Sequence, residues 1–333
     1  MKKILTVLLL MSVILPAGKL KAQQIPQFSQ YMFNGLYINP AYAGYKEELY
    51  AHAMYRKQWM GIKGAPQTVM LGVDADLGRG SNLGLVYAND QIGANMTNSI
   101  MLGYAFRFPV SEEGRLSLGL AGGAIYYGLD KSPDKIDITD PAVVAAENAW
   151  RPQIDAGLYI DWPNFYAGFS VMGLIPNRAS KVDGLTDLDG NPIESMQIMR
   201  TNPTWFLTFG GLVHLNENLA LAPSTLLKTD FKSPLSLDLS AMLVFSETLW
   251  LGLTYRTGLN FTYGERDRSP DALRQTNALV IVAEVFLTNN IRLGAAYDFD
   301  LNGLATGYNG GIEISLGYYM VKAHRRYATP RYF

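Results

Sequence analysis

The chain has 333 residues, of which 48% are hydrophobic and only 17% are charged, and its formal net charge is −1. An ordinary soluble domain carries about 25% charged residues, so the composition favours a membrane protein. The near-zero net charge gives no electrostatic case for a nucleic-acid partner. The lack of cysteine excludes disulfides, thiol-ligated metals and a lipid-modified cysteine.

A secretory signal peptide is predicted at residues 1–22. Two lysines precede an apolar stretch at residues 4–17, and Leu20-Lys21-Ala22 offers a cleavage site before Gln23. The apolar stretch is shorter than the ~20 residues that a membrane-spanning helix needs. We therefore expect cleavage, in preference to a retained membrane anchor.

Residues 23–47 are rich in aromatic side chains, asparagine and proline, and show no strand-like alternation. A solvated tail of this composition would expose an apolar patch of the kind that monomers avoid. We therefore expect an ordered plug-like segment, in preference to a flexible leader. The candidate partner-binding residues in this segment are Phe28, Tyr31, Phe33, Asn39, Pro40 and Tyr42.

Residues 48–321 contain a series of short segments in which apolar and polar residues alternate, as in Leu235–Ala241 and Ile312–Tyr318. A period of two predicts a sheet with one apolar and one polar face. Following a signal peptide, with 20 Tyr, 14 Phe and 32 Gly, the pattern predicts an all-β fold: a transmembrane antiparallel up-and-down β-barrel. About fourteen strands are predicted, at 48–60, 67–76, 82–91, 97–108, 115–128, 151–161, 165–174, 203–215, 218–228, 234–245, 248–258, 276–287, 290–299 and 310–321.

The lengths of the connections favour a barrel over a soluble β-sandwich. Outer-membrane barrels alternate short periplasmic turns with longer extracellular loops. Every second connection is short: Leu77–Ser81, Pro109–Gly114, Trp162–Asn164, Asn216–Glu217, Ser246–Glu247 and Thr288–Asn289. The four longest connections all fall in the opposite class: Leu129–Trp150, Ile175–Asn202, Leu259–Gln275 and Asp300–Asn309. This alternation places residues 23–47 and 322–333 on the periplasmic side.

Residues 322–333 form a basic and aromatic tail that includes Arg325, Arg326 and Tyr332. Arginine and tyrosine are common anchors in protein interfaces, so the tail suits an acidic surface of a periplasmic partner. The alternative is that Phe333 is an aromatic signal for barrel assembly.

Charged residues within the predicted strands need an orientation, because Arg or Lys facing lipid at the membrane midplane costs about 2–4 kcal/mol. We expect them to face the lumen or lie near the rims, and to pair across the lumen. The functional alternative is that they line a conduit or bind a plug. These residues are Arg56, Asp74, Arg107, Asp155, Asp238, Arg256, Glu284, Arg292 and Asp298.

No motif in the sequence predicts catalysis. His52, His214 and His324 are far apart and lack ligand spacing. Asp187–Asn191 resembles a calcium loop but lacks the downstream glutamate, so a turn is the better interpretation. There is no nucleophile elbow. We therefore expect a protein that is not an enzyme, with no catalytic residue, cofactor or metal.

Several blocks of sequence together carry a resemblance to a known family. They are 26–34 (PQFSQYMFN), 37–44 (YINPAYAG), 55–61 (YRKQWMG), 64–68 (GAPQT), 90–93 (DQIG) and 329–333 (TPRYF). The chain closely resembles the PorP/SprF family, outer-membrane proteins of the type IX secretion and gliding-motility systems of Bacteroidetes. Where the family has Asn-Pro-Leu-Tyr, this chain has Asn34-Gly35-Leu36-Tyr37.

The resemblance implies an interaction protein of the bacterial outer membrane. Family members accept or hold type IX cargo that carries a C-terminal signal domain, especially large cell-surface adhesins, and some connect to periplasmic ring and peptidoglycan-associated components. Whether this chain is a core component or a cargo-specific paralogue stays open. The alternatives are a porin or small-hydrophobe transporter, and an outer-membrane enzyme such as a phospholipase.

The width of the predicted barrel connects this role to a mechanism. A barrel's own side chains fill its interior only up to about eight strands, so residues 23–47 are a natural plug. The long outer connections Leu129–Trp150 and Ile175–Asn202, with Trp150 as a candidate anchor, are expected to hold the cargo domain. The alternative is that these connections fold over and close the lumen.

Overall fold

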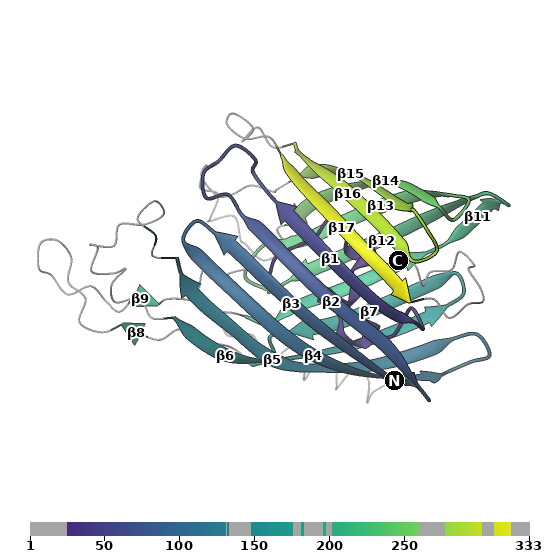
Figure 1. Cartoon of the computed structure of the whole chain (residues 1–333), viewed down its shortest axis with the longest axis horizontal. Coiled ribbons are helices and arrows are strands. Elements are labelled where there is room, and N and C mark those ends of the chain that lie inside the picture. Colours follow the sequence, from purple (N-terminus) through teal and green to yellow (C-terminus); the bar gives the residue numbers. More distant parts are fainter. Residues whose placement is uncertain are drawn as a thin grey trace, which may run out of the picture.

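A computed structural model describes residues 25–130, 132, 148–175, 181–182, 196–197, 202–259, 277–301 and 310–320. Most of these residues form one closed antiparallel sheet (Figure 1). Its first seven strands are β1 (Leu49–Lys57), β2 (Gln67–Gly78), β3 (Ser81–Ile92), β4 (Asn95–Pro109), β5 (Arg115–Leu129), β6 (Ala149–Trp162) and β7 (Phe165–Met172). The rest are β10 (Thr204–Gly211), β11 (Val213–Asn216), β12 (Leu219–Thr229), β13 (Leu235–Phe245), β14 (Leu249–Leu259), β15 (Ala278–Phe286), β16 (Ile291–Asp300) and β17 (Gly311–Met320).

The barrel has fourteen strands. Strand β17 pairs with β1, and β10 and β11 both pair with β12, so they are two parts of one strand interrupted at Leu212. Every predicted strand is present, with its ends within three residues of the predicted ones. The predicted connection Ile175–Asn202 also holds a two-stranded pair that we did not predict, β8 (Lys181–Val182) with β9 (Met196–Gln197).

The strands turn large apolar side chains outward and bury charged and polar side chains, together with some apolar ones, inside the barrel, which is the reverse of a soluble protein. On β4, Leu102 is 59% exposed while its neighbour Met101 is buried, and on β17 Leu316 is exposed while Ser315 is buried. The outward apolar band suits lipid. All nine charged strand residues for which we predicted a lumen or rim position are buried, and none lies on the exposed apolar face.

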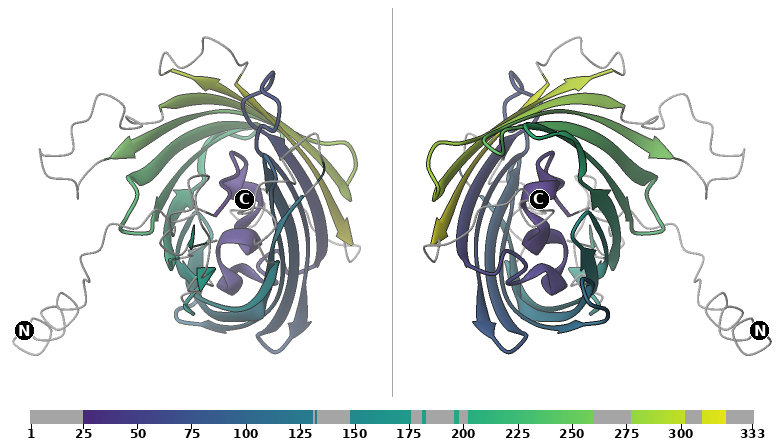
Figure 2. Two further views of the ribbon diagram at one scale, coloured as in Figure 1. Left: turned by 90° about the vertical axis from the view of Figure 1, so that its left-hand side faces the viewer. Right: turned by 90° about the vertical axis from the view of Figure 1, so that its right-hand side faces the viewer.

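Three short helices lie within the ring of strands, as the two end views show (Figure 2). They are η1 (Tyr31–Phe33), α2 (Gly35–Ile38) and η2 (Pro40–Tyr42). Their apolar side chains are buried and join an apolar cluster with the barrel wall, in which Phe33 and Tyr45 are 0% exposed. None of the helices in the described part of the chain is long and apolar enough to cross a bilayer.

Residues 25–48, which we call the luminal segment, run the length of the barrel interior. At one end the Ile25 carbonyl accepts a 2.5 Å hydrogen bond from Lys228 Nζ, next to the end of β12. At the other end Glu47 pairs with Arg115, the first residue of β5. Ile25 lies at the end of the barrel where the four long connections join the strands, which we call the long-connection end. Glu47 lies at the opposite end, where the short turns join the strands, which we call the short-turn end.

This path corrects one prediction from the sequence. We placed residues 23–47 on the short-turn, periplasmic side, because β1 begins there. Only the last residues of the segment lie at that end, and its described start at Ile25 lies at the opposite, long-connection end. The order of the strands fixes where the segment joins the barrel, but its path depends on side-chain contacts inside the lumen.

Candidate functional site

The luminal segment is clamped to the barrel wall at Ser29 and Gln30. The backbone amides of both residues donate to the Glu313 carboxylate, each at 2.8 Å. Arg56 Nη1 donates to the same carboxylate at 3.0 Å and to Ser29 Oγ at 2.8 Å. Glu313 is 0% exposed, and charge-assisted bonds in such surroundings are stronger than neutral ones. One strand carboxylate therefore fixes two consecutive residues of the segment.

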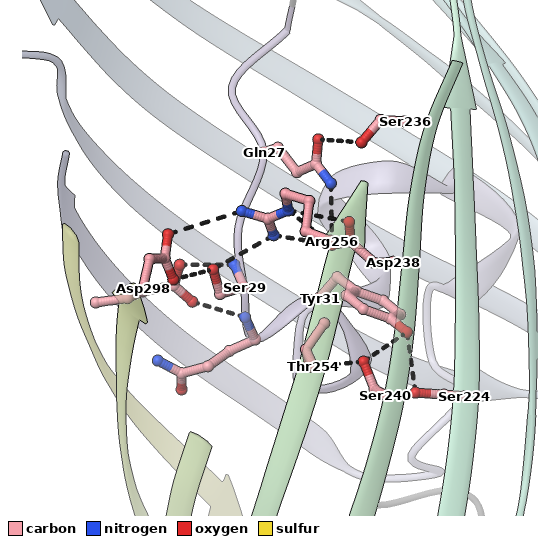
Figure 3. A network of polar contacts seen from close by, with 12 residues as sticks. Gln27, Ser29, Tyr31, Ser224, Ser236, Asp238, Ser240, Thr254, Arg256 and Asp298 are labelled. Carbon is pink, nitrogen blue, oxygen red and sulfur yellow. Dashed lines mark hydrogen bonds and ion pairs between the residues drawn. The ribbon is translucent and has the colours of Figure 1, made fainter. Parts of the chain in front are cut away.

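A second set of ionic contacts extends this clamp around the wall (Figure 3). Ser29 Oγ donates to Asp298 at 2.8 Å, and Asp298 also pairs with Arg56. Arg256 binds both oxygens of Asp238, with Nε–Oδ1 at 2.9 Å and Nη2–Oδ2 at 2.8 Å. Gln27 Nε2 donates to Asp238 Oδ2 at 3.0 Å.

Deeper in the lumen the segment is held by neutral groups. The Tyr31 hydroxyl lies 3.0 Å from Ser224 Oγ and 3.2 Å from Ser240 Oγ (Figure 3). Asn34 Oδ1 lies 2.8 Å from Nε2 of His52 on β1.

Asn39 both shapes the segment and attaches it to the wall. Its Oδ1 accepts a 2.9 Å bond from the amide of Ala41, which caps η2, with Pro40 at the first position of that helix. Its Nδ2 donates to the Leu158 carbonyl on β6 at 2.9 Å. The approach is this close because Gly157 has no side chain, and a Cβ there would meet the Asn39 amide.

At the short-turn end, Lys46 is buried between aromatic rings. Its Nζ lies 3.6 Å from the centroid of the Tyr50 ring and donates to the Tyr319 hydroxyl at 3.2 Å. The Gly44 amide, two residues earlier, donates to Asp74 Oδ2 at 2.9 Å.

The candidate residues of the luminal segment contact the barrel itself. Phe28, Tyr31, Phe33, Asn39, Pro40 and Tyr42 are all buried inside it. Trp150 is the second residue of β6 and is 61% exposed, and the centroid of its ring lies 5.1 Å from that of Tyr126, as suits an interfacial aromatic residue. Arg325, Arg326 and Tyr332 lie outside the described residues.

The ion pairs differ from our prediction that charges pair across the lumen. Arg256 pairs with Asp238 directly opposite on the next strand, and Arg56 pairs in the same way with Glu313. Ser29, Gln30 and Glu313 were missed as attachment residues. Glu313 had a usable signal, because it shares the inward parity of Ser315. In the described part of the chain, no cluster of His, Asp, Glu or Cys could hold a metal ion.

Comparison with known proteins yields one family match and a set of similar folds. The sequence model of a family described as Type IX secretion system membrane protein PorP/SprF matches residues 20–318. The structure resembles the CymD monoaromatic hydrocarbon channel with a TM-score of 0.52 at 13% identity, covering 88% of this chain and 94% of that one.

A Pseudomonas aeruginosa FadL homologue gives a TM-score of 0.47 at 13% identity, covering 88% of this chain and 94% of that one. Omp33 of Acinetobacter baumannii gives 0.45 at 10% identity, covering 82% and 98%. At these identities the resemblance concerns the fold alone. No curated protein sequence matches the chain.

Proposed function

Because the chain belongs to the PorP/SprF family of type IX secretion system membrane proteins, we propose that this outer-membrane barrel binds an exported protein through its C-terminal signal domain. The bound protein, such as a large surface adhesin, is then held at the cell surface. The role is one of interaction and anchoring, and it needs no catalytic residue.

The single observation that carries this proposal is the occupied lumen. The luminal segment contacts the wall from Lys228 at one end to Arg115 at the other, and Phe33 and Ala41 in its middle are fully buried. A passive porin keeps a water-filled channel. A barrel filled by its own chain is better suited to presenting its rim to a partner.

The cargo contacts are proposed at the long-connection end, on the part of the rim formed by β5, β6 and β7. The two longest connections leave these strands: one joins β5 to β6, and the other joins β7 to β10. Loops on a rigid scaffold commonly carry binding function. The tail at residues 322–333 is proposed to reach periplasmic components of the secretion system through Arg325 and Arg326.

The test shortens residues 131–147 and 183–195 in turn and together, and measures retention of the exported protein on intact cells. We expect retention to fall with each deletion and to be lost with both. Shortening residues 302–309, in the shortest of the four long connections, is the matched control and should leave retention unchanged. Normal retention with both long connections shortened would refute the cargo-binding proposal.

The alternative is a channel for small hydrophobic molecules, and one observation favours it: a mainly apolar cavity beside the luminal segment. Conductance and uptake of apolar solutes by the purified barrel in vesicles would support a channel. Co-purification of an exported protein from solubilised outer membrane would support anchoring. If only lipid and assembly factors co-purify, the anchoring proposal fails.

A further inference from the structure

A cavity of about 110 Å³ lies between the luminal segment and strands β3 to β7. We call it the outer cavity. Five of the inward-facing residues that line it are glycine, alanine or serine: Gly84, Ala88, Ser99, Gly103 and Ala121. Side chains of this size leave part of the lumen unfilled. The larger lining residues Val86, Met101 and Ile125 give the wall between them an apolar surface.

The strand register shows that the outer cavity is long and narrow. Two rows of lining residues each lie level across β3, β4 and β5: Gly84 with Gly103 and Ala121, and Asp90 with Thr97 and Tyr127. The rows are six residues apart along each strand, so at about 3.3 Å per residue the cavity extends about 20 Å along the wall. A compact cavity of about 150 Å³ holds a benzene ring. A smaller volume spread over this length suits an unbranched chain better than a ring.

The luminal segment closes the inner end of the outer cavity, where Pro40 lines it. One row further toward the short-turn end, Gly119 and Gly157 lie opposite each other on β5 and β6. A Cβ on Gly119 would meet the backbone of Ala41, and a Cβ on Gly157 would meet the side-chain amide of Asn39. The segment therefore lies directly on the wall and leaves no room for a chain to pass along these two strands. The outer cavity is a blind pocket there.

The other end of the outer cavity reaches the long-connection end of the barrel. Pro26, which follows Ile25, and Asn202, which precedes β10, line the cavity there. Both residues are half-buried. Their positions place the entrance of the pocket on the side that faces the cell exterior in outer-membrane barrels.

The carboxylates of the outer cavity are bonded into its wall at two separate places. At the inner end, Asp155 accepts bonds from Gln153 Nε2 at 2.8 Å and from the Gly173 amide at 2.7 Å. At the mouth, Asp90 accepts a bond from Thr68 Oγ1 at 2.7 Å. None of the described residues that line the cavity is lysine, arginine or histidine. An anionic ligand would therefore meet like charges without a cation to balance them.

We propose that the outer cavity binds an unbranched alkyl chain with an uncharged head. The chain enters from the long-connection end and packs against Leu36, Val86 and Met101, while the head stays toward the mouth. Each CH₂ group that the chain buries raises its affinity about fourfold. The site does not depend on the proposed anchoring of an exported protein.

The test uses the full-length protein in lipid nanodiscs and an octanol that carries a photoreactive diazirine in its chain. On illumination the probe attaches to the residues beside it, and peptide mass spectrometry maps them. We expect attachment at Val86 and Met101 that excess n-octanol suppresses. Attachment at lipid-facing Leu102 reports only partitioning into the bilayer and should not be suppressed.

Two competitors test the chemistry of the ligand. Octanoate keeps the chain but carries a carboxylate, and because like charges repel, it should need at least about tenfold higher concentration than n-octanol to suppress the attachment. Cyclooctanol keeps the hydroxyl head and the number of carbons but closes them into a ring, so it should also compete less well. Octanoate or cyclooctanol that competes as well as n-octanol would overturn the proposal.

A matched pair of variants tests the place of binding. A Cβ on Gly103 would have no heavy atom closer than 3.6 Å, so Gly103→Leu fills the inner end of the cavity and should abolish the suppressible attachment. Gly122→Leu makes the same change on the exposed face of β5, where a Cβ has nothing within 4 Å, and should change nothing. Ala88→Leu fills the outer half and decides the matter if Gly103→Leu does not fold. Suppressible attachment at Val86 and Met101 in a folded filling variant would overturn the proposal.

Two sources can supply the chain: a free neutral alkyl compound, or the acyl chain of a lipid whose head stays at the rim. They are distinguished by extracting the purified barrel with organic solvent and identifying the lipids by mass spectrometry. A lipid that co-purifies with the unaltered protein and with Gly122→Leu, but not with Gly103→Leu, assigns the cavity to a lipid chain. Equal lipid content in all three assigns it to a free compound.

Discussion

At the scale of single residues, the ion pair between Arg256 and Asp238 is expected to stabilise the folded barrel. Their side chains are 11% and 0% exposed. Arg256→Gln leaves Asp238 buried without its counter-charge, a loss that typically costs about 3–5 kcal/mol. We therefore expect the free energy of unfolding to fall by about 3 kcal/mol, measured by urea unfolding in lipid vesicles.

Arg115→Gln is the matched control for this prediction. Arg115 also pairs with a carboxylate, Glu47, but the two side chains are 37% and 32% exposed. Exposed pairs contribute about 0–1 kcal/mol, so the control should unfold nearly as the unaltered protein does. If both substitutions cost the same, burial does not decide the strength of these pairs.

The inward orientation of the charged strand residues could be predicted because a charge facing lipid is costly. Their partners could not. The contacts of Arg56 with Asp298 and Ser29 join residues 242 and 27 positions apart in the chain. Such contacts depend on which strands become neighbours and on where the luminal segment lies, and neither leaves a local pattern in the sequence.

At the scale of elements, Gly119 on β5 controls the fit of the luminal segment. A Cβ at this position would meet the backbone of Pro40 and Ala41, which cannot rotate away as a side chain can. We expect Gly119→Ala to push η2 off the wall and to loosen residues 27–42. Limited proteolysis of the folded barrel in detergent should then show faster cleavage within these residues.

Gly122, three residues further along β5, provides the control. A Cβ there has nothing within 4 Å, and the residue is exposed. Gly122→Ala changes the same strand by the same atom, so it should leave the cleavage pattern unaltered. Equal protection in both variants would mean that the contact at Gly119 does not hold the segment.

The strands were predictable as elements because alternation is a local signal that repeats along each one. The interruption between β10 and β11 could not be predicted in this way. Gly210 and Gly211, which precede it, have no side chain and so neither follow nor break the alternation. The short helices were also missed. A helix of four residues, such as Gly35–Ile38, is too short to show helical periodicity.

At the scale of the whole molecule, the alternation of short and long connections gives the barrel two distinct ends. The same alternation misled us about the luminal segment, because it locates only the junction with β1. Inside the lumen the segment crosses from one end to the other. The contact of Ile25 with Lys228 and the contact of Gln27 with Asp238 both lie near the long-connection end. The orientation of a segment within a closed barrel is a tertiary property.

This path predicts on which side of the outer membrane the start of the segment can be reached. Ile25 is at the long-connection end, which in outer-membrane barrels faces the cell exterior. An epitope inserted directly before Ile25 should therefore bind antibody on intact cells. The same epitope between Glu112 and Glu113, in the short turn between β4 and β5, should bind only after the outer membrane is permeabilised. If only the second epitope were labelled on intact cells, the barrel would have the opposite orientation in the membrane. If neither were labelled, the start of the segment would lie on the periplasmic side.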